Sequence, residues 1–90
     1  GYDNTAVGRN ALNKNTGGYA NTAVGSCTSD ANTSGDFNTS IGYAALFANT
    51  TADNNVAVGN VALTANTTGA GNVAIGSGSL RANTTGVLLL

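Results

Sequence analysis

The chain has 90 residues, of which only 8% are charged, and its net charge is -1. A soluble domain ordinarily carries about 25% charged residues. The basic residues are Arg9, Lys14 and Arg81, too few for a basic face that would bind nucleic acid. Because there is no histidine and Cys27 is the lone cysteine, an internal disulfide and the Ser/His and Cys/His schemes of nucleophilic catalysis are excluded. The longest apolar run, residues 87–90, is far shorter than the roughly 20 residues that span a bilayer, so no membrane insertion by this segment is expected.

A short motif recurs along the chain with a constant period. The motif Asn-[Thr/Val]-[Ala/Ser]-[Val/Ile]-Gly begins every 17 residues, and its five copies follow one another without an insertion. Residues 1–3 match the end of a preceding repeat, and residues 89–90 form a tail or the start of the next segment. The five repeats between them span residues 4–88 and cover 4–20, 21–37, 38–54, 55–71 and 72–88.

The length and composition of the repeat indicate its fold class. A unit of 17 residues is too short for a helix pair, since helical repeats need about 33 residues or more. The Gly, Asn, Thr and Val content also disfavours helix. Short strands stacked about 4.8 Å apart can each pair with the next copy. The sequence therefore predicts an all-β protein, a parallel β-solenoid or β-roll of five 17-residue rungs.

In such a stack every repeat position forms a column of like residues, and three columns bear on the core. Two large apolar columns are predicted to face each other as the core, whereas a small column that alternates with the first is predicted to point away and contact another surface. The Val/Ile column consists of Val7, Val24, Ile41, Val58 and Ile75. The Leu column consists of Leu12, Leu46, Leu63 and Leu80, and is interrupted by Ser29. The small column, called the Ala column here, consists of Ala6, Ala23, Ser40, Ala57 and Ala74.

Asparagine and glycine columns are predicted at the bends of the solenoid. Asn tolerates left-handed backbone and bonds its own backbone, and buried Asn side chains can also bond one another along a stack. The first Asn column is Asn4, Asn21, Asn38, Asn55 and Asn72. The second Asn column is Asn15, Asn32, Asn49, Asn66 and Asn83. The Gly column, predicted to end each strand with unusual dihedral angles, is Gly8, Gly25, Gly42, Gly59 and Gly76. Alternatively, some Asn residues could carry sugar, because N-x-[Ser/Thr] sequons begin at Asn32, Asn38, Asn49, Asn66 and Asn83.

The predicted core is thin for a chain of this length. Ordering the chain costs about 1.5 kcal/mol per residue, far more than nine large apolar side chains return. Low charge and a column of small residues suggest burial against other chains. The sequence thus favours a homo-oligomer, most simply a trimer, and the alternative is a monomeric solenoid with both faces exposed to solvent.

The repeats resemble those of known fibrous proteins. The segment from Asn72 to Gly76 is similar to the head repeats of trimeric autotransporter adhesins of the YadA type, although those repeats are shorter. The longer pattern from Asn55 to Gly69 resembles the N-T-A-[IV]-G…N-T-T-G arrays of bacteriophage tail fibres and bacterial surface proteins. The resemblance implies an intertwined homotrimer in an extracellular, cell-surface or virion appendage, where the chain would be a stiff shaft or head.

We therefore expect a structural or adhesive segment of a filament and not an enzyme, with no catalytic, cofactor-binding or metal-binding residues. Its expected partners are copies of itself and a host-surface glycan or protein. The acids Asp3, Asp30, Asp36 and Asp53 are scattered over three repeat positions, and Asp36 and Asp53, which share one of them, are not expected to act as an acid/base pair.

The alternative function is recognition of ice or glycan through regular surface columns. One candidate column is Thr16, Thr33, Thr50, Thr67 and Thr84, and another is Thr51, Thr68 and Thr85. These Thr residues are predicted instead to cap corners. Similarly, Tyr2, Tyr19 and Phe37 could bind a glycan, but are predicted to close one corner of the solenoid.

Overall fold

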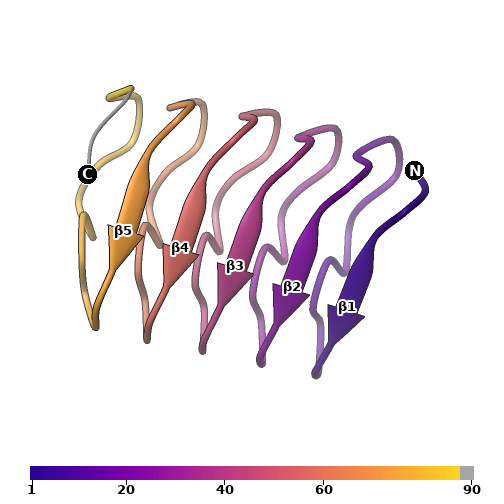
Figure 1. Ribbon diagram of the computed structural model, residues 1–90, viewed down its shortest axis with the longest axis horizontal. Helices are drawn as coiled ribbons and strands as arrows, with labels where there is room; N and C mark the ends of the chain where they lie inside the picture. Colours follow the sequence, from indigo (N-terminus) through magenta and orange to yellow (C-terminus); the bar gives the residue numbers. More distant parts are fainter. Residues whose placement is uncertain (88–90) are drawn as a thin grey trace.

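The computed structural model describes residues 1–87, which coil into five stacked rungs (Figure 1). Each rung contributes one three-residue strand to a single parallel sheet with strand order β1-β2-β3-β4-β5. The strands are β1 (Thr5–Val7), β2 (Thr22–Val24), β3 (Thr39–Ile41), β4 (Val56–Val58) and β5 (Val73–Ile75). The prediction of an all-β parallel β-solenoid is confirmed. The predicted tail, residues 89–90, lies outside the described residues.

Successive rungs are stacked in register around the whole circuit. Val24 pairs with Ile41, 17 positions later, and the same offset holds for every strand pair. The side of each rung opposite the strand is not extended, yet it is also bonded between rungs. For example, the Leu46 N–H donates to the Ala62 carbonyl at 2.9 Å. Backbone hydrogen bonds therefore join neighbouring rungs on both sides of a body that measures 27 × 21 × 15 Å.

The core is built from the Ala and Leu columns, which corrects one prediction. Ala57 and Ala74 are fully buried, as are Leu46 and Leu63, and these residues belong to one buried cluster. The Val/Ile column lies on the outer face of the sheet, where Ile75 is 69% exposed. The prediction that the Val/Ile column faces the Leu column was wrong. The prediction that the Ala column points away from the core was wrong for the same reason.

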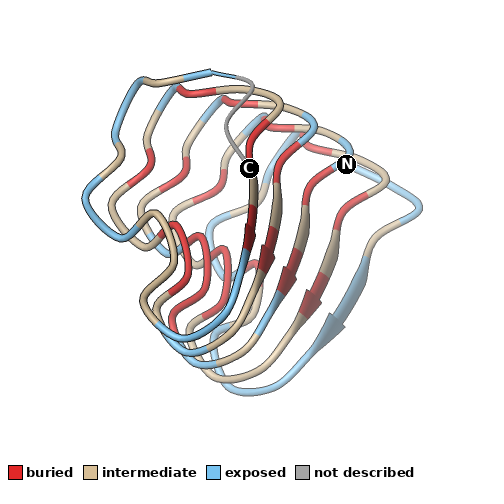
Figure 2. Ribbon diagram, turned by 60° about the vertical axis from the view of Figure 1, so that its left-hand side comes forward, coloured by how far each residue is buried: buried red, intermediate tan, exposed pale blue. Residues whose placement is uncertain are grey.

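The narrow interior explains this arrangement. In a three-residue strand the central side chain points to one face and its two neighbours point to the other. Figure 2 shows buried segments at the strands and on the side opposite them. A Leu side chain from the opposite side already fills the space, so the strand position that meets it must be small. The small size of the Ala column does reflect close packing, but against the Leu column of the same chain.

The Gly column ends each strand with a backbone that other residues rarely adopt. All five glycines have φ between 124° and 136°. A Cβ atom added at Gly59 would lie 2.6 Å from the carbonyl oxygen of Gly76 on the next rung. Glycine is thus required both for the turn and for the close approach of successive rungs.

On the side opposite the strands, two positions of each rung adopt the left-handed conformation. In the first rung these are Asn10 and Leu12, and the equivalent positions repeat the pattern in the other rungs. Positive φ is uncommon for non-glycine residues and is most costly for β-branched ones. Val61, with φ of 53°, is therefore the most strained of the described residues at its position, which elsewhere carries Asn, Cys, Ala or Gly.

Replacing Val61 with Asn should stabilise the protein by about 1 kcal/mol, because Asn tolerates the left-handed conformation that Asn10 adopts in the first rung. The free energy of unfolding in urea, followed by far-UV circular dichroism, measures the change. Val56→Asn is the matched control, since Val56 lies in an extended strand and gains no such relief. Equal effects of the two substitutions would contradict the assignment of strain to Val61.

Candidate functional site

The second Asn column forms a continuous ladder of side-chain amides along the stack. The Asn49 Nδ2 donates to the Oδ1 of Asn32 at 3.0 Å and to the carbonyl of Ala52 at 3.1 Å. The Asn66 Nδ2 donates in turn to the Asn49 Oδ1 at 3.0 Å. The same bonds link Asn15 to Asn32 and Asn66 to Asn83. Each of these amides thus bonds the backbone of its own corner and the Asn side chain of a neighbouring rung.

The first Asn column connects backbone segments within and between rungs. The Asn55 Nδ2 donates to the carbonyl of Gly69 at 2.9 Å, which ties the start of the rung to its second corner. The Asn55 Oδ1 accepts the N–H of Asn72 on the next rung at 2.9 Å. The Asn55 N–H donates to the Asn38 Oδ1 at 3.0 Å. Both Asn columns are therefore structural, as predicted for corner residues.

Sugar attachment at the buried sequons is incompatible with this fold. Asn32, Asn38, Asn49 and Asn66 are each at most 2% exposed, and their Nδ2 atoms donate hydrogen bonds inside the solenoid. Asn83, which is half-buried, donates to the Asn66 Oδ1 and to the Gly86 carbonyl. The sequons are therefore a by-product of the two structural Asn columns in the folded chain.

The two Thr columns differ in their roles. The Thr33 carbonyl accepts three consecutive N–H groups from the preceding rung, those of Thr16, Gly17 and Gly18, at 2.9–3.1 Å. The hydroxyl of Thr33 donates to the Thr50 carbonyl at 3.2 Å. This first Thr column therefore caps a corner. The column of Thr51, Thr68 and Thr85 is exposed and presents its side chains to solvent.

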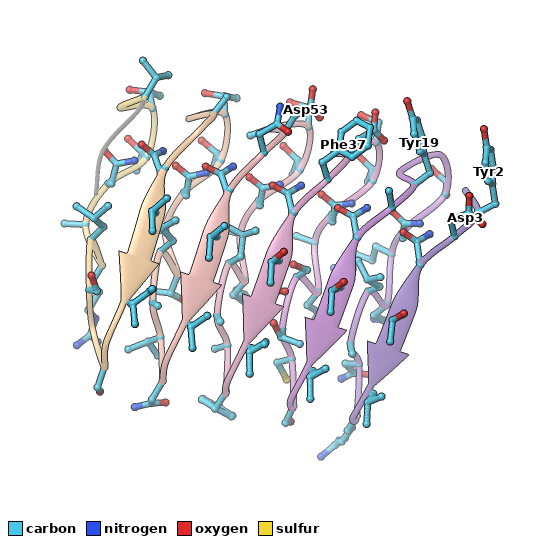
Figure 3. All side chains as sticks on the ribbon, in the orientation of Figure 1. Tyr2, Asp3, Tyr19, Phe37 and Asp53 are labelled. Carbon is cyan, nitrogen blue, oxygen red and sulfur yellow. The ribbon has the colours of Figure 1, made fainter. Side chains whose placement is uncertain are left out.

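Three aromatic rings lie in a row along another corner (Figure 3). Tyr2 and Tyr19 are stacked with centroids 5.4 Å apart, and Phe37 meets Tyr19 edge-on at 5.3 Å. Each ring belongs to a different rung, so the row adds contacts of about 0.5–1.5 kcal/mol between rungs. Tyr2 and Phe37 remain 69% and 50% exposed, which leaves part of the row accessible.

Asp36 and Asp53 occupy the same repeat position as Tyr2 and Tyr19, on the next two rungs of this corner. The Asp36 Oδ1 accepts the N–H of Tyr19 at 2.9 Å, and the Asp53 Oδ1 accepts the N–H of Asp36 at 2.8 Å. Each carboxylate thus holds the backbone of the preceding rung. Cys27 lies elsewhere, half-buried on the side opposite the strands, in a left-handed conformation.

The outer surface of the sheet, called the strand face here, carries β-branched side chains only. It is formed by the first and third residue of every strand. These residues are Thr5, Val7, Thr22, Val24, Thr39, Ile41, Val56, Val58, Val73 and Ile75. None of them is charged, and Val7, Ile41 and Ile75 are 57%, 39% and 69% exposed. Contiguous exposed apolar surfaces of this kind mark sites of interaction.

Other kinds of site are not seen in residues 1–87. These residues contain no group of three His, Cys, Asp or Glu side chains that could hold a metal ion, and no pocket. None of the described residues forms a helix that could cross a membrane. No protein-family model, curated protein or solved structure matches the chain.

Proposed function

We propose that the chain is a stiff structural and adhesive segment of an extracellular or virion fibre, in which copies associate through the strand face as a homotrimer. The observation that carries the proposal is the combination of in-register stacking with an uncharged, exposed strand face. The resemblance of the repeats to adhesin heads and tail-fibre arrays points to the same function.

Stiffness follows from the bonding between rungs. A bend between two rungs must stretch the backbone hydrogen bonds on both sides of the solenoid. It must also stretch the side-chain hydrogen bonds of both Asn columns. Around the second and third rungs, for example, Val24 is paired with Ile41 and Asn32 accepts from Asn49. Buried hydrogen bonds of this kind are costly to leave unmade. The solenoid therefore suits a role in which it transmits force or holds other parts at a distance.

A second copy of the chain is the partner that best fits the strand face. The exposed side chains of Val7, Ile41 and Ile75 lie on every second rung, and a copy presents the same spacing over the same length. A stable contact buries about 800 Å² per partner. The broadest side of the backbone measures only 27 × 21 Å, so a single pairwise contact would be small. A closed trimer gives each copy two neighbours, and it is the arrangement that the resemblance to adhesin heads implies.

Charge on the strand face should dissociate the assembly without unfolding it. Val58 is half-buried on this face, so Val58→Lys places an ammonium group in the contact between copies while the core is unchanged. Light scattering during gel filtration should give three times the chain mass for the unaltered protein and the single chain mass for Val58→Lys. Far-UV circular dichroism should be the same for both proteins.

Thr68→Lys is the matched control for this experiment, because Thr68 is exposed at a corner away from the sheet. It should leave the trimer intact. A single chain mass for the unaltered protein at all concentrations would refute the association, and dissociation by Thr68→Lys as well would refute its location.

The exposed column of Thr51, Thr68 and Thr85 supports a second candidate, recognition of ice or glycan. The same Thr68→Lys variant tests it. Ice shaping or glycan retention by the unaltered protein, with loss of that activity in Thr68→Lys, would favour recognition over a purely structural role.

A further inference from the structure

Two departures from the repeat pattern meet inside the core. Ser29 replaces leucine in the Leu column of the second rung, and Ser40 replaces alanine in the Ala column of the third. Their hydroxyl oxygens are 2.8 Å apart, and the two residues are 2% and 0% exposed. The Ser40 hydroxyl also lies 3.4 Å from the carbonyl of Thr22. Neither hydroxyl is therefore buried without a partner.

The two serines occupy positions that the fold brings together in every pair of rungs. They are 11 residues apart, as are Leu46 and Ala57, which belong to the same buried cluster. Where the first position is leucine the second is alanine, and where it is serine the second is serine as well. The serine pair thus replaces one apolar contact with one polar contact, so that each hydroxyl has the other as its partner.

A chain of near-identical rungs faces a problem of register. The backbone hydrogen bonds and the Asn side-chain hydrogen bonds between β2 and β3 could form almost as well between β2 and β4, because each column carries like residues. Skipping one rung only lengthens the loop that must close, and a doubled loop lowers the probability of closure by about threefold. Repeat proteins are prone to misassembly of this kind.

We propose that the Ser29–Ser40 pair selects the correct register of the second and third rungs. If the second rung stacked on the fourth instead, Ser29 would meet Ala57, and its buried hydroxyl would lose its partner. An unpaired buried hydroxyl disfavours that arrangement by about tenfold or more. The serine pair distinguishes the correct register from the skipped one, whereas a Leu/Ala pair would pack equally well in either register.

Disulfide trapping during refolding tests the proposal. All proteins carry Cys27→Ala, which removes the native thiol. Thr22→Cys with Thr39→Cys reports the correct register, because these residues are paired on neighbouring strands. Thr22→Cys with Val56→Cys reports the skipped register, because two rungs separate these residues by about 9.6 Å in the native stack, beyond the reach of a disulfide. The chain is diluted from denaturant to a low concentration and oxidised at successive times.

The serine pair is compared with two double variants. Ser29→Leu with Ser40→Ala restores the pattern of the other rungs, and Ser29→Ala with Ser40→Ala removes both hydroxyls with little change of volume. Either should raise the early yield of the skipped-register disulfide by about tenfold relative to the protein with both serines. If the first variant fails to fold, the second still decides the question. An unchanged yield of the skipped disulfide would overturn the proposal.

Discussion

Replacing Ala57 with leucine should destabilise the solenoid by about 3 kcal/mol and unfold it if its total stability is small. Ala57 is fully buried at the centre of β4 and packs in the same cluster as Leu46 and Leu63. Three added carbon atoms have no space there, and overpacking of a filled core typically costs about 1–3 kcal/mol. The backbone cannot move apart to make room without breaking the bonds between rungs. Urea denaturation followed by far-UV circular dichroism measures the loss.

The adjacent residue provides the control for this prediction. Val58→Leu enlarges a side chain on the strand face, where it meets solvent or a second copy, and should change the free energy of unfolding of the single chain by less than about 0.5 kcal/mol. The comparison should be made at a concentration where light scattering shows the single chain. Greater destabilisation by Val58→Leu than by Ala57→Leu would mean that the two faces of the sheet are assigned the wrong way round.

Replacing Asn49 with alanine should be the second severe change, at a cost of about 3 kcal/mol or more. The substitution removes the donor to the Asn32 Oδ1 and the Ala52 carbonyl, and the acceptor of the Asn66 Nδ2. All three asparagines are buried. Each buried polar group left without its partner costs about 1–3 kcal/mol, and the losses here occur together. Thermal unfolding by calorimetry, with the midpoint compared with that of the unaltered protein, gives the effect.

Asn60→Ala is the control for the ladder, because Asn60 is exposed at a different repeat position. Its effect should lie within about 0.5 kcal/mol of zero. If Asn49→Ala proved as mild as Asn60→Ala, the ladder would contribute little to stability, and the rigidity argued for the fibre would lose its main support.

The period of the sequence predicts the rungs, the strand register and the columns, because stacking in a solenoid is a direct consequence of the repeat. Which face of the strand points into the core was harder to predict from the sequence. Alternation shows that Val58 and Ala57 point to opposite faces, but not which face is inside. The preference of β-branched residues for strands is satisfied equally well on a half-exposed surface. The informative property was side-chain volume. Because no residue of the Ala column is larger than serine, this column must pack against a column of large side chains, and the Leu column is the one that fits.

The opposite side of each rung could not be predicted from local preference. Leu46 and Leu63 adopt left-handed conformations that leucine does not favour by itself, because the path of the chain imposes them and burial compensates for the strain. The contact between Ser29 and Ser40 depends on the same path. An offset of 11 residues has no meaning in the sequence until the width of the rung is known.

The amide ladder gives the molecule a polarity along its axis. Every side-chain bond in the second Asn column runs in one direction, from the Nδ2 of the later residue to the Oδ1 of the earlier one, as from Asn66 to Asn49 and from Asn49 to Asn32. The bond dipoles therefore add head to tail, and each bond strengthens its neighbours. One end of any such stack offers donors and the other offers acceptors. Two stacks can be joined end to end only when they point the same way, so a filament made from these rungs has a defined direction.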